Sequence, residues 1–173
     1  MPKTIAIFGT GKAKPESAIY NLAYQTGLCL TEAGYSIANG GYNGIMLASA
    51  QGARQANGIT IGVTCQAFGT KPCNQYITQE IPTASLDQRL DTLISLGQAY
   101  IILPGGTGTL LELAKVWELK NKGFLNSQKL IILLGDFWQP LLDLIKIDDP
   151  KSCQAVHLVE KPDQIIALLN ENL

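Results

Sequence analysis

Short apolar runs alternate with longer segments in which apolar residues recur at helical spacing along most of this chain. The short runs end in glycine or polar turns, which is typical of buried strands. The expected strands are Ile5–Phe8, Tyr35–Ala38, Ile59–Val63, Ala99–Leu103, Leu130–Leu134 and Val156–Val159. The stretch Thr64–Thr83 is less regular, and we expect one short strand within it, at Tyr76–Glu80.

Segments with helical spacing lie between most of these strands. The expected helices are Glu16–Ala33, Ile45–Ala56, Leu86–Leu96, Leu110–Lys122 and Trp138–Ile145, with a last helix after Pro162. Strands that alternate with helices imply right-handed crossovers and a parallel sheet. The runs Tyr100–Leu103 and Leu130–Leu134 lack polar alternation, as expected for strands covered on both faces. We therefore predict one Rossmann-like α/β domain over residues 1–173, a doubly wound parallel sheet with helices on both faces.

Composition and charge narrow the choice of ligand. Apolar residues make up 46% of the chain and charged residues 16%, which is ample material for one core. The net charge of −1 gives no electrostatic footprint for nucleic acid or an anionic membrane surface. No stretch approaches the roughly 20 apolar residues of a membrane span, and no signal peptide is recognisable. With one histidine and four scattered cysteines, we expect a cytoplasmic protein that ligates no metal.

Three of the predicted strand-to-helix loops are rich in glycine. Because such loops emerge at the carboxyl edge of a parallel sheet, they converge where ligands bind. Glycine lets a ligand approach the backbone, and the free amides of a helix N-terminus favour an anion. We therefore expect a phosphate-bearing small molecule there, and the candidate binding residues are Gly9, Thr10, Gly11, Gly40, Gly41, Asn43, Gly44, Gly105, Gly106, Thr107, Gly108 and Thr109.

The familiar nucleotide-binding motifs do not fit these loops. After Gly9 and Gly11, Lys14 stands where GxGxxG has its third glycine. Gly11-Lys12 does not begin a P-loop, because Ala13 replaces the serine or threonine. An alternative is that the glycines only form tight turns, and this alternative is strongest for Gly9–Gly11.

Two charged residues, Arg89 and Glu112, are further candidates. The spacing of Thr109 and Glu112 matches a capping box, in which Glu112 would bond back to the Thr109 backbone. It also suits a carboxylate in the first turn of a helix that faces the ligand, where it could act as a base or nucleophile. Arg89 lies at the margin of a predicted apolar helix face, so it either pairs with an anion, such as Glu112 or a phosphate, or extends to water over Leu96.

The segment Pro104–Glu112 resembles PGGxGTxxE, the signature of the Lonely Guy family of cytokinin-activating phosphoribohydrolases within the SLOG superfamily. The likeness covers nearly the whole chain. Gly40–Met46 is similar to the family's GGGxxGLM segment, and Arg89 stands where the family has the arginine of MxxRK. The resemblance implies that Arg89 and Glu112 are catalytic if the chain is such a hydrolase, and that both also belong to the binding site.

Other positions resemble a sister branch that contains the molybdenum cofactor carrier proteins. Leu90 replaces the lysine of the RK pair, whereas Gly52-Ala53 and Asn57–Val63 are similar to the carrier branch. This resemblance implies binding, storage and transfer of molybdenum cofactor, a phosphorylated pterin (molybdopterin) whose own dithiolene holds the metal. Apo-molybdoenzymes are then the expected partners. The alternative is hydrolysis of a cytokinin-type nucleoside 5′-monophosphate to a free base and ribose 5-phosphate, and a nucleotide sensor without chemistry is a third possibility.

The same resemblance implies a homo-oligomer, either a dimer or a tetramer. We expect a contact surface on the helix after the PGGTGT loop, formed by Leu113, Val116 and Trp117. Trp117 and Trp138 are otherwise interpreted as core or interface residues, and His157 as a structural residue of its strand.

Overall fold

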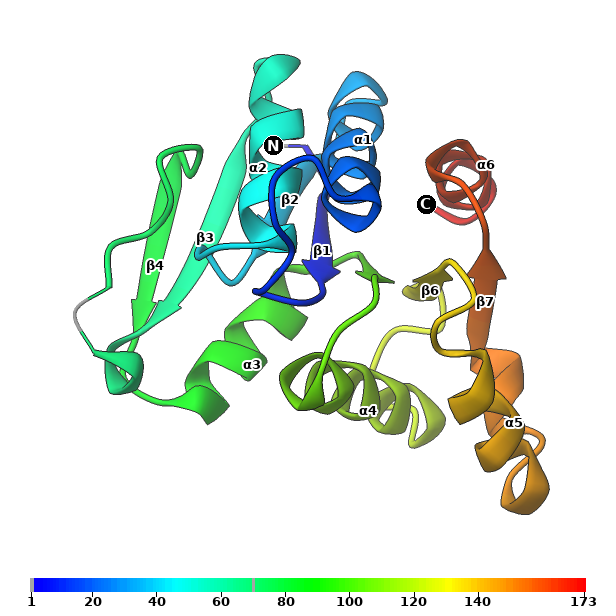
Figure 1. The fold of residues 1–173 in the computed structure, drawn as a ribbon. Coiled ribbons are helices and arrows are strands. Elements are labelled where there is room, and N and C mark those ends of the chain that lie inside the picture. Colours follow the sequence, from blue (N-terminus) through cyan, green and yellow to red (C-terminus); the bar gives the residue numbers. More distant parts are fainter. Residues whose placement is uncertain (1, 70) are drawn as a thin grey trace.

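The computed structural model describes residues 2–69 and 71–173 and shows one parallel sheet of seven strands in the order β4-β3-β2-β1-β5-β6-β7 (Figure 1). The chain starts in the middle of the sheet, builds one half outward to β4, and returns to β5 beside β1. The strands are β1 (Thr4–Phe8), β2 (Ser36–Asn39), β3 (Thr60–Cys65), β4 (Gln79–Thr83), β5 (Ala99–Ile102), β6 (Leu130–Leu134) and β7 (Val156–Val159). The predicted Rossmann-like α/β class is confirmed.

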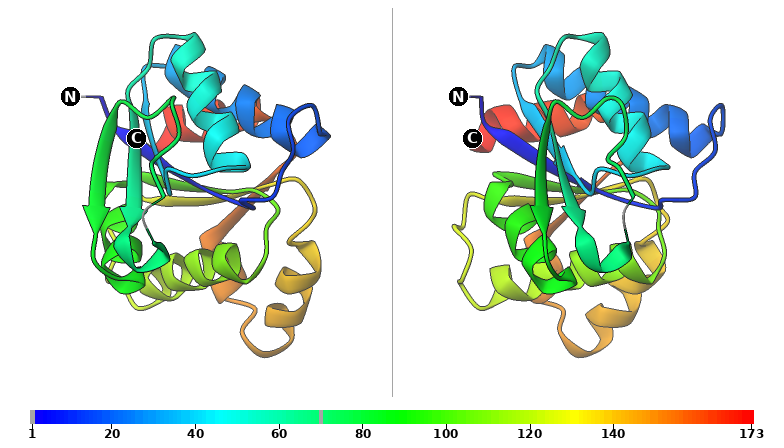
Figure 2. Two further views of the ribbon diagram at one scale, coloured as in Figure 1. Left: turned by 60° about the vertical axis from the view of Figure 1, so that its left-hand side comes forward. Right: turned by 90° about the vertical axis from the view of Figure 1, so that its left-hand side faces the viewer.

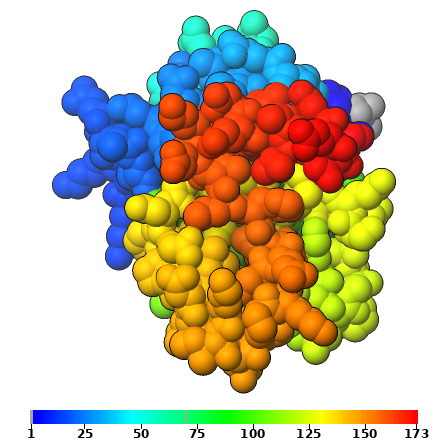
Figure 3. Space-filling model, turned by 90° about the vertical axis from the view of Figure 1, so that its right-hand side faces the viewer, coloured from blue at the N-terminus to red at the C-terminus, as the bar shows by residue number. Residues whose placement is uncertain are grey.

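Helices cover both faces of the sheet, with α1, α2 and α6 on one side and α3, α4 and α5 on the other (Figures 1 and 2). At the β7 edge, α6 lies above the segment that contains α5 and β7 (Figure 3). The helices are α1 (Ala18–Glu32), α2 (Ile45–Gln55), α3 (Leu86–Leu96), α4 (Thr107–Asn121), α5 (Gln139–Asp148) and α6 (Pro162–Asn172), with short 3-10 turns η1 (Gln66–Phe68) and η2 (Ser152–Ala155). No helix in the described chain is long and apolar enough to cross a membrane.

Alternate residues of the central strands enter two separate apolar cores. In β1, Ile5 and Ile7 pack beneath α1, α2 and α6, whereas Ala6 and Phe8 pack on the opposite face. The side chains of all four are at most 2% exposed. This two-sided burial explains why the strands are apolar without alternation. Because helices pack on both faces of the sheet, the loops at its carboxyl edge are attached to a rigid core.

Two of the boundaries that differ from the sequence-based expectation have a clear local reason. The strand expected at Tyr76–Glu80 lies later, at Gln79–Thr83, and it contains Pro82. Proline is tolerated there because β4 is an edge strand, so its missing N–H breaks no ladder. Helix α1 begins at Ala18 because Glu16 has a positive φ and the Ser17 side chain accepts a hydrogen bond from the Tyr20 amide in the first turn.

The predicted oligomer surface on the helix after the PGGTGT loop is wrong. Leu113 and Val116 are fully buried and Trp117 is 6% exposed, all in the core beneath α4. The interpretation of the tryptophans as core residues is confirmed, since the Trp117 indole donates to the Ser152 carbonyl and the Trp138 indole to the Leu103 carbonyl. The apolar side chains of α4 thus face inward because the helix covers the sheet.

Candidate functional site

The carboxyl ends of β1 and β5 form the point where the strand order reverses, which is the usual ligand position in doubly wound sheets. Three loops are tied together there. The Thr10 amide donates to the Pro104 carbonyl (3.0 Å), and the Ile45 amide, at the start of α2, donates to the Thr10 carbonyl (2.9 Å). The predicted convergence of the three glycine loops is therefore a feature of the structure.

The N-terminus of α4 offers free backbone amides to this edge. Helix α4 begins at Thr107, and Gly106 before it provides no side-chain cap. The first amides of an α-helix have no partner within the helix, and the helix dipole adds positive potential. A Cβ on Gly106 or Gly108 would meet no neighbouring atom within 4 Å, so both positions face open space. This combination suits a phosphate group.

Four of the predicted binding glycines pack closely against neighbouring atoms of the protein. Gly40, Gly41, Gly44 and Gly105 line neither of the two cavities described below. A side chain at Gly40 would overlap the Arg89 guanidinium, and one at Gly44 would overlap the backbone of the β1–α1 loop. Gly41 and Gly44 also have positive φ, which only glycine adopts readily. Glycine at these positions allows neighbouring groups of the protein to lie close to the backbone.

The Gly9–Gly11 loop does not lead directly into a helix. Helix α1 begins seven residues after Gly11, and its first turn is capped by Ser17, so this loop has no helix N-terminus with which to bind an anion. Thr10 uses its backbone N–H and C=O to join the other two loops. The loop is nevertheless placed beside the ligand site, since Gly9, Thr10 and Gly11 all line a cavity there.

A cavity of about 530 Å³, here called the inner cavity, lies between these loops and helices α3 and α4. Predicted residues at its wall are Gly9, Thr10, Gly11, Arg89, Gly106, Thr107, Gly108, Thr109 and Glu112. It also contains residues outside that prediction, namely Lys12, Tyr42, Met46, Phe68, Leu86, Leu90 and Leu111. Its volume lies within the usual range for small-molecule sites.

Arg89 is almost entirely buried at the base of the inner cavity. Its Nε donates to the Val63 carbonyl at 2.8 Å, and its guanidinium carbon lies near the neighbouring rings of Tyr42 (5.8 Å to the centroid) and Phe68 (5.6 Å). The side chain is 8% exposed, so the alternative in which it extends to water over Leu96 is wrong. The remaining guanidinium N–H groups point at longer contacts, with Met46 Sδ at 3.9 Å and Glu112 at 3.9 Å.

Glu112 faces Arg89 from the second turn of α4. Its Oε1 lies 3.9 Å from Arg89 Nη1, and its side chain is 12% exposed. The capping-box interpretation is wrong, because α4 begins at Thr107 and Thr109 is already inside the helix. Burial raises the pKa of Glu112 to about 7, although the nearby Arg89 charge opposes the rise. Glu112 can therefore exchange a proton near neutral pH.

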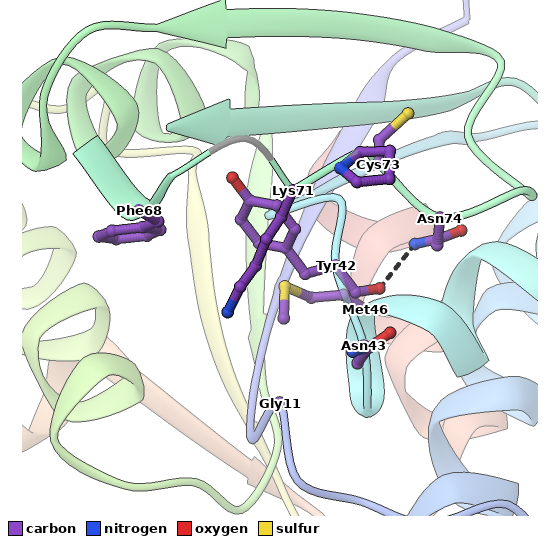
Figure 4. A pocket seen from close by; sticks show the side chains of 9 residues that line it. Gly11, Tyr42, Asn43, Met46, Phe68, Lys71, Cys73 and Asn74 are labelled. Carbon is purple, nitrogen blue, oxygen red and sulfur yellow. Dashed lines mark hydrogen bonds between the residues drawn. The ribbon is translucent and has the colours of Figure 1, made fainter. Parts of the chain in front are cut away.

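A second cavity, here called the outer cavity, measures about 550 Å³ and adjoins the inner one through Gly11, Tyr42, Met46 and Phe68. The predicted residue Asn43 lies here (Figure 4). The remaining wall is formed by Lys71, Pro72, Cys73 and Asn74. These four follow η1 in a segment without periodicity or a known motif, so no pattern in the sequence indicated them. Within residues 2–69 and 71–173, no group of three or more His, Cys, Asp or Glu side chains could hold a metal ion.

Two solved structures match almost the full length of the chain. The molybdenum cofactor binding protein of the phototrophic bacterium Rippkaea orientalis is 27% identical with a TM-score of 0.81, over 99% of this chain and 97% of that one. The Moco carrier protein of Chlamydomonas reinhardtii shares the fold, with 23% identity, a TM-score of 0.79 and coverage of 99% and 97%.

Sequence comparison identifies related proteins and a matching family model. The cytokinin riboside 5′-monophosphate phosphoribohydrolase of Mycobacterium tuberculosis is 30% identical over 138 residues, which cover 78% of this chain and 71% of that protein. The model of the SLOG cluster4 family matches residues 2–166. The resemblance seen in the motifs is thereby confirmed, and the chain belongs to the SLOG cluster4 family.

Proposed function

We propose that this protein binds molybdenum cofactor and holds it for transfer to molybdoenzymes. The observation that carries the proposal is the pair of adjoining cavities, with an uncapped helix N-terminus in one of them. The cofactor is a phosphate monoester on a fused pterin, so it is longer than a phosphate group with one small ring. Its phosphate suits the amides of Thr107 and Gly108, and the outer cavity gives room for the rest.

Several properties of the site support a binding role for this cofactor. Donors at the phosphate end are supplied mostly by backbone, which needs no reorganisation on binding. Tyr42, Phe68 and Met46 form an apolar and aromatic wall between the two cavities, which suits a flat ring system. When bound, the cofactor brings its own dithiolene ligand for molybdenum, so the protein need only enclose it. The whole-length likeness to the Rippkaea orientalis protein supports the same assignment.

A phosphoribohydrolase is the second candidate, and the Arg89–Glu112 pair is the observation that favours it. A carboxyl group with a pKa near 7 beside a ligand cavity is suited to general acid–base chemistry. In such a reaction Glu112 would activate water or stabilise the developing positive charge on the ribose, and Arg89 would orient the nucleotide. Against this, Leu90 stands where the hydrolase motif has lysine, so α3 brings only one cation to the cavity.

Two measurements on the purified protein test these candidates. Under anaerobic conditions the protein is incubated with molybdenum cofactor and separated by gel filtration, and bound pterin and molybdenum are quantified. If pterin and molybdenum elute with the protein and the bound cofactor oxidises more slowly, the carrier function is supported. If the cofactor elutes separately from the protein, the carrier function is wrong.

The hydrolase is tested by incubation with AMP and an N6-prenylated AMP, followed by measurement of ribose 5-phosphate. Turnover that disappears in Glu112→Gln would establish the hydrolase and displace the carrier as the main function. We expect no turnover with either nucleotide.

A further inference from the structure

The inner cavity contains a carboxyl group, that of Glu112, close to the helix amides at which the proposed function puts a phosphate. We propose that the cavity binds its phosphate monoester together with a proton from solvent, and that Glu112 holds this proton and donates it in a hydrogen bond to the ligand. Ligand affinity is then coupled to pH. The inference rests on the phosphate position of the proposed function and adds a pH-dependent recognition group to that site.

Charge distribution is the first argument. Among the described residues that line the inner cavity, the charged side chains are those of Lys12, Arg89 and Glu112, so Glu112 is the only acidic one. Arg89 faces it from α3, and Lys12 lines the cavity from the β1–α1 loop. The loop before α2 and the turn η1 supply the aromatic residues Tyr42 and Phe68, which carry no charge at neutral pH. An ionised Glu112 would therefore be the one negative side chain in a cavity that is otherwise suited to an anion.

The position of Glu112 on α4 is the second argument. Gly108 and Glu112 are four residues apart, so they lie on the same face of the helix, and both line the inner cavity. Helical side chains lean toward the helix N-terminus, which brings the carboxyl toward the free amides of Thr107 and Gly108. Lys115, the next cation along α4, is paired with Asp91 at 2.7 Å. A phosphate on these amides would lie beside Glu112.

The Glu112 carboxyl has unused hydrogen-bonding capacity. Its Oε1 lies 3.9 Å from Arg89 Nη1, which is an ion-pair distance but too long for a hydrogen bond. Within residues 2–69 and 71–173, no other cation pairs with it. Its side chain is 12% exposed and lines the cavity, so a ligand can reach it. A carboxyl group donates a hydrogen bond only when it is protonated.

A bound phosphate favours the protonated form of Glu112. A phosphate monoester carries nearly two negative charges at pH 7.5, because its second pKa is about 6. It would repel a carboxylate, whereas a protonated carboxyl can donate to one of its oxygens. Burial already raises the pKa of Glu112 to about 7 in the free protein, so little further energy is needed to add the proton. In molybdenum cofactor the dithiolene and the phosphate ester sit on neighbouring atoms of one ring, so both bring negative charge to the same part of the site.

The test is isothermal titration calorimetry of the purified protein under anaerobic conditions, with molybdenum cofactor and AMP as probes. Titrations at pH 7.5 in two buffers of different ionisation enthalpy give the number of protons taken up per ligand. We expect the wild-type protein to take up roughly half a proton or more, and to bind about tenfold more weakly at pH 9 than at pH 7. Glu112→Gln keeps a hydrogen-bond donor but cannot ionise, so it should take up almost no proton and keep its affinity over this range.

Glu118→Gln is the matched control. Glu118 lies on the same helix, its side chain is 62% exposed, and it pairs with Lys122 at 3.5 Å. It lines neither the inner nor the outer cavity. This variant should take up protons as the wild type does. Loss of proton uptake in Glu118→Gln would show that the coupling does not depend on the carboxyl in the cavity, and the inference would be wrong.

The outcomes separate this inference from the proposed function. If the wild-type protein binds the cofactor without proton uptake, or if Glu112→Gln takes up as many protons, the inference is wrong and the carrier function stands. If the wild-type protein binds AMP with proton uptake but does not bind the cofactor, the carrier function fails and the inference holds. If neither probe binds, the phosphate position is wrong and both fail.

Discussion

The loop before α2 and the loop before α4 contain the same residue type at the same edge of the sheet, yet glycine is needed for different reasons. In the first loop, Gly40 and Gly44 leave no room for a side chain, because Arg89 and the β1–α1 backbone occupy that space. In the second, Gly106 and Gly108 face open space beside free helix amides. The glycines of the first loop pack closely against other parts of the protein, whereas Gly106 and Gly108 leave space beside the helix amides. Glycine content alone does not distinguish them.

The strongest test of the packed loop is Gly44→Ala. The added Cβ would overlap backbone atoms of Thr10 and Gly11, and Gly44 has a φ of 64°. Overpacking against backbone and the left-handed conformation each cost energy, so we expect a loss of roughly 3 kcal/mol in the free energy of unfolding. Urea denaturation measures it.

Gly34→Ala is the matched control for that experiment. Gly34 also has a positive φ, of 88°, but a Cβ there would meet no atom within 4 Å. It should therefore lose only about 1 kcal/mol, the cost of the backbone conformation alone. Equal losses in the two variants would show that packing does not determine the glycine at 44.

The buried pair of Arg89 and Glu112 predicts an effect of pH on stability that is intermediate in size. The pKa of Glu112 in the folded protein is about 7, above its ordinary value of 4.5. The folded state therefore binds this proton more tightly than the unfolded state, and stability falls as pH rises from about 4.5 to about 7. We expect Glu112→Gln to remove a decrease of about 2 kcal/mol between pH 5 and pH 8.

The exposed pair formed by Lys115 and Asp91 is the control for this pH dependence. Its Asp91 side chain is 68% exposed, so the pair contributes little to stability. Asp91→Asn should leave the pH dependence of unfolding as it is in the wild type. An unchanged slope in Glu112→Gln would mean that Glu112 titrates in the folded protein as it does in the unfolded chain.

The smallest effect is expected at the open loop. Gly108→Ala adds a methyl group to the first turn of α4 where no atom lies nearby, and alanine favours the helix over glycine. The free energy of unfolding should stay the same or rise by less than about 1 kcal/mol. Clear destabilisation would show that this glycine is also required by packing, and the difference between the two loops would disappear.

The sequence predicted the fold and most of the inner cavity, because both depend on regular patterns in the sequence. The apolar runs define the strands, and the strand-to-helix order brings the β1 and β5 loops together. Arg89 and Glu112 were found by motif, although their burial depends on how α3 and α4 pack. Phe68 and Lys71 were missed because they lie in the irregular stretch between β3 and β4, where position is determined by tertiary hydrogen bonds such as those of Asn74.

The central claim is that the open amides of α4 hold the phosphate of molybdenum cofactor. The most direct measurement compares cofactor retention by Gly108→Asp and Gly108→Ala. A Cβ at this position meets no atom within 4 Å, and only aspartate places a negative charge beside the proposed phosphate position. We predict that Gly108→Ala retains the cofactor and that Gly108→Asp loses it while remaining folded. Equal retention by the two variants would contradict the account.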